Sequence, residues 1–239
     1  MKRIWIFGGS FCTGYQTGGG SRDWIAQLDA DVTVWATTPQ SPQSQLQMVQ
    51  HAFKCHALEN RMLHRPDYIL YDYPPANRVH LPTSIPDTEQ TMLNNKKWAN
   101  SRTGHQFECG CEADTSKHWS LRSLTTIDEW HKWRRTDPVH TEFVADTKRK
   151  FISGELPDQS THEYTRQALD LIKASGIPYS WYSANNTSHK AFEEHQDRYL
   201  NIHTLNGNVP SQKYSSMTFN HLSIVQNIMW ADYFNRKIC

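Results

Sequence analysis

Ser10 is the side chain near the start of the sequence that could do chemistry. It follows the apolar run from Ile4 to Phe7 and the pair Gly8-Gly9. The short run and the glycines predict a buried strand that ends in a tight turn just before the serine. Open α/β sheets bind ligands at the carboxyl ends of their strands, where Ser10 would be exposed as a nucleophile. The alternative is an ordinary Gly-Gly-Ser turn, which this segment alone favours.

A second group has the chemistry of metal ligands: His105, Cys109, Cys111 and His118. The Cys-x-Cys spacing differs from the two-residue spacing typical of structural zinc sites, and one cysteine pair is half a site. We therefore favour a loop with free thiols and expect no metal.

Cys12 and the glycines around it suggest two further kinds of site. No motif ties a histidine to Cys12, so we expect a small buried cysteine and not a rival nucleophile. The glycine-rich residues 8–20 contain neither the GxGxxG nor the Walker pattern, which argues against a bound nucleotide. No cofactor is expected.

The composition narrows the possible partners and location. Lys and Arg number 25 against 24 Asp and Glu, so no overall field points to nucleic acid or to a membrane surface. The 5 cysteines form no dense framework, which favours a reducing compartment. No signal peptide or membrane-spanning pattern is visible, so we expect a cytoplasmic protein. A viral origin and the oligomeric state stay open.

Strand and helix patterns alternate along residues 1–239, which predicts one α/β domain with a parallel sheet and helices on both faces. Strand patterns cover residues 4–7, 31–36, 67–73, 178–183 and 200–205. Helix signals follow Ser21, Ser41, Thr126, Asp137, Ser160 and Ser223, and also cover residues 187–199. Residues 76–136 show no clear period and are interpreted as an irregular insertion that shapes the binding site.

Three of the predicted helices carry apolar stripes that we expect to face the core. The first stripe consists of Leu46, Val49, Phe53 and Ala57. The second consists of Tyr164, Ala168, Leu171 and Ile172 and ends before Gly176. The third consists of Leu222, Val225, Met229 and Tyr233.

The segments IWIFGGSFCTG (4–14) and NHLSIVQNIMWADYF (220–234) together resemble the SGNH hydrolases, also called the GDSL esterase/lipase family. In that family a Gly-Asp-Ser block follows the first strand, and an Asp three residues before a His precedes the last helix. The resemblance implies a flavodoxin-like, three-layer α/β/α sandwich with five parallel strands, in agreement with the five predicted strands. The order of the predicted strands and helices agrees with the family along the whole chain, whereas the matching motifs lie mainly at its two ends.

The resemblance implies that Ser10 attacks an ester carbonyl and that His221 is the general base. A neutral serine needs an adjacent base to become a good nucleophile, and histidine titrates in the right range. The substrate implied is a small ester, such as an acetyl group on a glycan. The alternative for His221 is a histidine at a helix start, bonded to a nearby backbone group.

Two acidic positions of the family pattern differ in this chain. Gly9 replaces the Asp of the first block, and Thr218 replaces the Asp three residues before His221. Thr218 or Asn220 could still accept a hydrogen bond from the imidazole, but neither carries charge. In a serine protease, replacing the equivalent acid by its amide lowers turnover roughly 10⁴-fold. These departures motivate an alternative hypothesis, a catalytically impaired relative that binds a partner or has a structural role.

The resemblance also implies three donors for the oxyanion hole: the backbone N–H groups of Ser10 and Thr38 and the side chain of Asn77. The family has a glycine after the second strand, where this chain has Ala36-Thr37-Thr38-Pro39. Asn77 follows the third strand at an offset that differs from the family's. Loss of one such donor lowers turnover by about 10²–10³.

Overall fold

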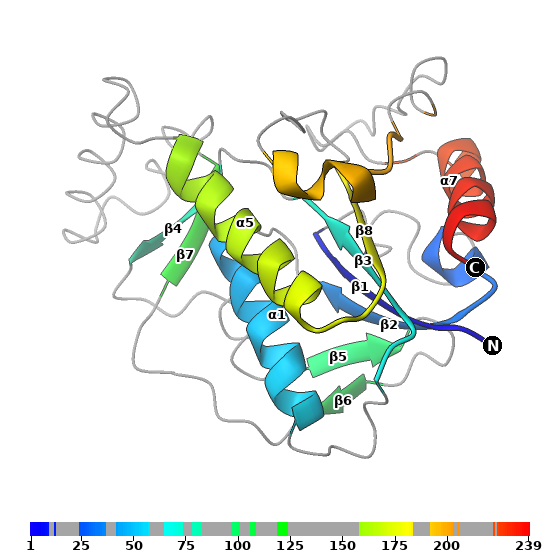
Figure 1. Cartoon of the computed structure of the whole chain (residues 1–239), viewed down its shortest axis with the longest axis horizontal. Coiled ribbons are helices and arrows are strands. Elements are labelled where there is room, and N and C mark those ends of the chain that lie inside the picture. Colours follow the sequence, from blue (N-terminus) through cyan, green and yellow to red (C-terminus); the bar gives the residue numbers. More distant parts are fainter. Residues whose placement is uncertain are drawn as a thin grey trace.

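The chain folds as an α/β protein around a twisted sheet (Figure 1). The computed structural model describes residues 1–9, 12, 24–36, 42–57, 65–73, 78–82, 97–100, 106–108, 119–123, 158–183, 192–202, 205, 222 and 224–239. The predicted helices after Thr126 and Asp137 lie outside these residues, as does Ser21.

The main sheet has six strands in the order β6-β5-β2-β1-β3-β8. Its parallel part consists of β1 (Arg3–Gly8), β2 (Asp31–Ala36), β3 (Tyr68–Asp72) and β8 (Tyr179–Tyr182). These four strands confirm the first four strand predictions. Their apolar runs are nearly continuous, as expected for strands covered on both faces.

The segment predicted to be irregular contains four short strands. They are β4 (Arg78–Pro82), β5 (Lys97–Asn100), β6 (Gln106–Glu108) and β7 (Trp119–Ser123). β5 pairs antiparallel with β2 and with β6, while β4 and β7 form a separate two-stranded sheet. Strands this short carry too few residues for an alternating pattern to stand out, and pairing with the edge of β2 gives β5 its hydrogen bonds.

The fifth predicted strand, residues 200–205, is not a strand in its described part. The chain instead makes a single parallel bridge between Trp181 and Tyr199, and Leu200 N donates to Trp181 O at 2.8 Å. Leu205 N then donates to Ile202 O at 3.0 Å, which turns the backbone away from an extended course.

The longer helices are α1 (Pro42–Ala57), α5 (Asp158–Ala174) and α7 (Ile224–Ile238). The short 3₁₀ helices are η2 (Ile25–Gln27) and η5 (Glu193–Arg198). α5 begins two residues before the predicted cap Ser160, and it ends before Gly176, whose φ of 68° needs a residue without a β-carbon. The polar segment 187–199 forms η5 in its described part.

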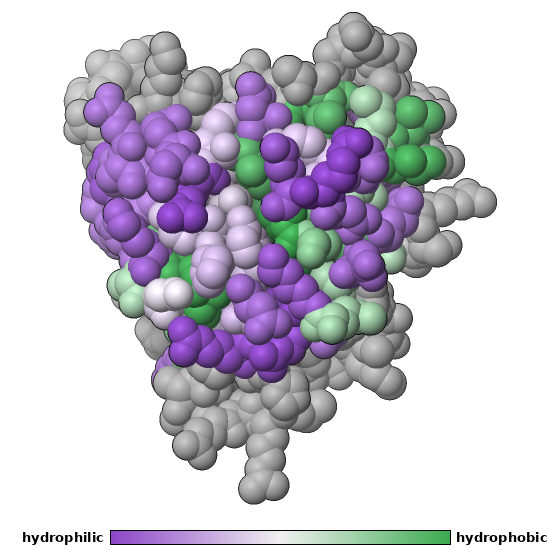
Figure 2. All heavy atoms as spheres, turned by 45° about the vertical axis from the view of Figure 1, so that its right-hand side comes forward, coloured by the Kyte–Doolittle hydropathy of each residue, from purple (hydrophilic) through white to green (hydrophobic). Residues whose placement is uncertain are grey.

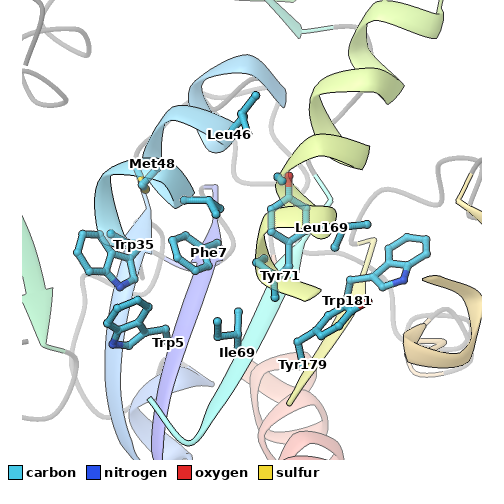
Figure 3. Close-up of a cluster of buried hydrophobic side chains, with 14 of the residues drawn as sticks. Trp5, Phe7, Trp35, Leu46, Met48, Ile69, Tyr71, Leu169, Tyr179 and Trp181 are labelled. Carbon is cyan, nitrogen blue, oxygen red and sulfur yellow. The ribbon is translucent and has the colours of Figure 1, made fainter. Parts of the chain in front are cut away.

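Side chains alternate between two buried clusters on opposite faces of the sheet. On the α1–α5 face, Trp5, Phe7, Ile69 and Tyr71 pack with residues such as Leu46, Val49, Leu169 and Ile172 (Figure 3). On the α7 face, Ile4, Ile6 and Leu70 pack with residues such as Trp24, Tyr182, Trp230 and Phe234. Apolar side chains thus hold helices against both faces of β1 and β3.

Two predicted apolar stripes are partly wrong. Leu171 of α5 and Val225 of α7 are 38% and 55% exposed. In α7 the buried side is set by Trp230 and Phe234, which stand one turn apart and lie against Trp24 at ring-centroid distances of 5.8 and 4.8 Å. These large rings bury more apolar area than Val225 would. The helix is therefore oriented with Trp230 and Phe234 toward the core and Val225 toward solvent.

The surface on the α7 side is largely hydrophilic, with hydrophobic side chains gathered in limited areas (Figure 2). None of the helices in the described part of the chain combines the length and the apolar character that a bilayer span requires.

Candidate functional site

The carboxyl ends of the four parallel strands meet at one edge of the sheet. β1 is central, with β2 on one side and β3 on the other, so the strand order reverses next to β1. Open α/β sheets bind ligands at such a switch point, beyond the carboxyl ends of the strands. Phe7 is the register partner of Tyr71, which brings Gly8 beside Asp72 at this edge.

The turn after β1 is tightly packed. Cys12 N donates to Gly9 O at 2.9 Å, and the Cys12 side chain is 2% exposed with its Sγ 3.4 Å from the Tyr182 hydroxyl. A β-carbon on Gly8 would lie 2.3 Å from Cys12 Sγ and 3.2 Å from Asp72 Cβ. Position 8 therefore requires glycine because Cys12 and Asp72 approach it closely. Cys12 is the small buried cysteine expected from the sequence.

The end of β3 is held by three hydrogen bonds. Gln45 Nε2 of α1 donates to Asp72 O at 2.6 Å, and Tyr73 N donates to Tyr182 O at 2.7 Å. The Tyr73 hydroxyl lies 3.0 Å from His162 Nδ1 at the start of α5. These contacts fix the backbone of Asp72 relative to β8, α1 and α5.

Asp72 is an acid that the sequence analysis did not single out. Its side chain is only 4% exposed, and it lies at the edge where the candidate site is expected. The signal was present in the sequence, because an acid stands inside the otherwise apolar and aromatic strand pattern DYILYDY. An acid at the carboxyl edge of a parallel sheet, where α/β proteins bind ligands, is a candidate functional residue.

The residues to which the sequence analysis assigned roles lie outside the described part of the chain: Ser10, Thr38, Asn77, Thr218 and His221. The candidate metal ligands His105, Cys109, Cys111 and His118 also lie outside it. Two described residues close to Ser10 and His221 in the sequence lie in one cluster. Cys12, two residues after Ser10, and Leu222, directly after His221, belong to the same buried cluster on the α7 face.

The start of α7 is tied to the core by Asn227. Its Oδ1 accepts a hydrogen bond from Trp24 N at 3.0 Å, and its Nδ2 donates to Leu222 O at 3.4 Å. Asn227 is 3% exposed, so these bonds form away from water, where their loss is costly. They anchor Leu222, the residue directly after His221, to the α7 face.

A buried histidine, His195 of η5, lies at the other end of the sheet. Its Nδ1 is 2.7 Å from the hydroxyl of Tyr179, the first residue of β8, and its Nε2 is 3.1 Å from Asp170 Oδ1. The pKa of His195 lies below its ordinary value because burial outweighs the opposite effect of the nearby carboxylates of Asp170 and Glu194. Because Tyr179 begins β8, we assign His195 a structural role and not a part in the candidate site.

No protein-family model matches the chain, and neither curated proteins nor solved structures provide a match. The resemblance of the two end segments to the SGNH hydrolases therefore stays a prediction from motifs.

Proposed function

We propose that the chain is a serine hydrolase of the SGNH type that cleaves a small ester, such as an acetyl group on a carbohydrate. One observation carries this proposal. Cys12 and Leu222 are 210 residues apart in the sequence and yet belong to one buried cluster on the α7 face. Cys12 lies two residues after Ser10, and Leu222 lies directly after His221. Their common cluster therefore supports the proposal that Ser10 and His221 lie close together at the carboxyl edge of β1.

The proposed fold is the five-stranded, three-layer sandwich of that family. The parallel order β2-β1-β3-β8 supports four of the five strands. The bridge between Trp181 and Tyr199 supports a fifth strand position beside β8, because it is parallel and lies on the side of β8 away from β3. The two buried clusters support helices on both faces.

In the proposed mechanism, Ser10 Oγ attacks the ester carbonyl carbon while His221 takes the serine proton. The backbone N–H groups of Ser10 and Thr38 and the side-chain amide of Asn77 stabilise the oxyanion. His221 then protonates the departing alcohol, and water hydrolyses the acyl-enzyme by the same steps in reverse. Thr218 accepts a hydrogen bond from the imidazole and orients it.

Labelling with a fluorophosphonate probe, followed by peptide mapping, tests this proposal. We expect the folded protein to be labelled at Ser10, and both Ser10→Ala and heat-unfolded protein to stay unlabelled. Hydrolysis of acetylated sugars should follow the same pattern. Labelling at another serine, or equal labelling of Ser10→Ala, would contradict the assigned nucleophile.

The second candidate function is a catalytically impaired protein of the same fold that binds a partner or has a structural role. The sequence observation that favours it is the absence of an acid at Gly9 and at Thr218. This alternative predicts that well-folded protein gives no fluorophosphonate label at any serine.

A further inference from the structure

We propose that His195 makes η5 a pH-sensitive clasp, which holds residues 192–202 against β8 near neutral pH and opens locally as the imidazole is protonated. The clasp lies away from the proposed hydrolase site and is independent of it. Its contacts join β8, α5 and η5 through one buried histidine, and all of them lie within the described part of the chain.

His195 ties η5 to two neighbouring elements. Its ring is fully buried, with Nδ1 2.7 Å from the Tyr179 hydroxyl of β8 and Nε2 3.1 Å from Asp170 Oδ1 of α5. Its backbone oxygen accepts a hydrogen bond from the Trp181 indole at 2.8 Å. Tyr179 and Trp181 belong to the same buried cluster (Figure 3), so a single residue of η5 is bonded at two positions along this strand.

The partners of the two ring nitrogens determine where the neutral imidazole carries its proton. An ionised carboxylate can only accept, so Nε2 is protonated and donates to Asp170. Burial raises the pKa of Tyr179 to about 12, so its phenol keeps its proton and donates it to Nδ1. A second proton on the ring has to go to Nδ1, and the hydrogen bond from Tyr179 is then lost.

Charged groups surround His195 and its phenol partner on all three elements. In the described part of the chain they are Asp170, Lys173 and Arg166 of α5 and Glu194, Asp197 and Arg198 of η5, with the titratable Tyr179 on β8. Burial and Lys173 oppose a protonated ring, whereas Asp170 and Glu194 favour it.

Burial outweighs the two carboxylates because the ring has lost its water while the acids have not. The side chains of Asp170 and Glu194 are 57% and 41% exposed, so water screens their attraction for an imidazolium. Glu194 is also paired with Arg166, with Oε1 and Nε 2.8 Å apart. The pKa of His195 therefore lies below its ordinary value when η5 is closed, and the ring binds a proton more readily once η5 has moved into water.

Opening of η5 releases the segment beside β8. Tyr199 forms a parallel bridge with Trp181, and Leu200 N donates to Trp181 O at 2.8 Å. The rings of Phe192 and Tyr199 lie 5.4 and 4.7 Å from the Trp181 ring, measured between centroids. All of these contacts come from residues 192–202, so they are lost together. The Trp181 indole proton and the Leu200 amide proton therefore report on the clasp.

The test is hydrogen exchange of these two protons, measured by NMR between pH 7.5 and pH 5. After correction for the intrinsic exchange rate, we expect their opening constant to rise several-fold as the pH falls below the ordinary histidine pKa of about 6.5. One histidine can change it by about tenfold per pH unit at most. Low concentrations of urea should accelerate exchange in β1 but not at these two protons, because a local opening exposes little surface.

Two variants test the histidine and its acid. In His195→Gln the amide can still bond to Tyr179 and Asp170 but does not titrate, so the opening constant should no longer depend on pH. In Asp170→Asn the pKa of His195 should fall further, because the attracting carboxylate is gone, and the rise in the opening constant should become larger and extend to lower pH. Loss of an ordinary hydrogen bond would instead raise the opening constant equally at every pH.

The matched control is Asp232→Asn on α7. The Asp232 side chain is 60% exposed, close to the 57% of Asp170, and it pairs with Arg236, with Oδ2 and Nη2 2.8 Å apart. We expect this variant to leave the opening constant and its pH dependence at the wild-type values.

The clasp is overturned by an opening constant that does not change with pH in the wild type, or by an equal pH dependence in folded His195→Gln. It is also overturned if the Trp181 indole and Leu200 protons respond to urea as β1 does, since they then exchange only on global unfolding. If His195→Gln does not fold, NMR titration of the His195 imidazole decides. A pKa below the ordinary value in the wild type and lower still in Asp170→Asn supports the clasp, and any other order overturns it.

Discussion

At the scale of single residues, the carboxyl edge of the sheet depends on close packing around Gly8. The position has no room for a β-carbon, because Cys12 Sγ and Asp72 Cβ fill the space that it would take. The same contacts bring Asp72 to the end of β1. Small changes at these residues should therefore affect the stability of the fold as well as the candidate site.

We expect Gly8→Ala to lower the free energy of unfolding by about 1–3 kcal/mol, because the new methyl group overlaps Cys12 Sγ. Urea denaturation measures this loss. The same substitution in a Cys12→Ala background should cost less, because the sulfur is gone. Equal costs in the two backgrounds would show that the contact does not limit the side chain at position 8.

The buried His195 should make stability depend on pH. Burial lowers its pKa in the folded state, so its contribution is fully present above the unfolded pKa of about 6.5 and is lost as the pH falls through the folded pKa. We expect the free energy of unfolding to decrease from pH 7.5 to pH 5, and less steeply in His195→Gln. Identical slopes in the two proteins would contradict this assignment.

At the scale of elements, α7 is held by two asparagines that accept hydrogen bonds from the backbone around η2. Asn227, which is buried, accepts from Trp24 N at 3.0 Å. Asn235, which is half-buried, accepts from Asp29 N at 2.7 Å and donates to Gln27 O at 3.1 Å. Lys2 Nζ also donates to Ile238 O at 2.6 Å, which joins the end of α7 to the residue before β1. These bonds set the position of α7 along the sheet.

The two asparagines provide a matched pair of variants. We expect Asn227→Ala to lower the free energy of unfolding by about 1–3 kcal/mol, because it removes a buried acceptor. Asn235→Ala should cost less, since water can reach this half-buried site and replace the two lost bonds. Thermal unfolding of both variants measures the difference. A larger loss for Asn235→Ala would show that burial does not determine the strength of these bonds.

The elements also show which sequence patterns are informative. β1, β2, β3 and β8 were predictable because strands covered on both faces have nearly continuous apolar runs. The strands KWAN and QFE were not, since their few mixed residues carry no period and their pairing depends on the edge of β2. The inward face of α7 was predicted from residue spacing alone. That prediction did not consider that Trp230 and Phe234 have more apolar area to bury than Val225.

At the scale of the whole molecule, the carboxyl edge of the parallel sheet was predictable, whereas the buried acid Asp72 at that edge was not. The strand-end glycines and the alternation of elements predicted the carboxyl edge of a parallel sheet, and the described strands have that arrangement. The position of Asp72 beside Gly8 depends on register, and register is a tertiary property that no local pattern contains. The predicted site residues lie outside the described part of the chain, so their roles stay predictions: Ser10, Thr38, Asn77, Thr218 and His221.

The sheet should be most protected from hydrogen exchange at its centre. β1 pairs with β2 and β3, and both of its faces are buried, so its amides should exchange only on extensive unfolding. β6 pairs with β5 at the rim of the sheet. Mass spectrometry of exchanged peptides should show slow exchange over Arg3–Gly8 and faster exchange over Gln106–Glu108. Equal protection would contradict this order.

The packing of α7 leaves apolar side chains of the nascent chain exposed during synthesis. Trp24 is synthesised 206 residues before Trp230, and Ile4 and Ile6 earlier still, yet the cover of these side chains includes Trp230 and Phe234. At about 5–20 residues per second, these apolar side chains wait roughly ten seconds or more for α7. During that interval the nascent chain exposes the surface that chaperones bind, and a release that stops short of α7 leaves it prone to aggregate.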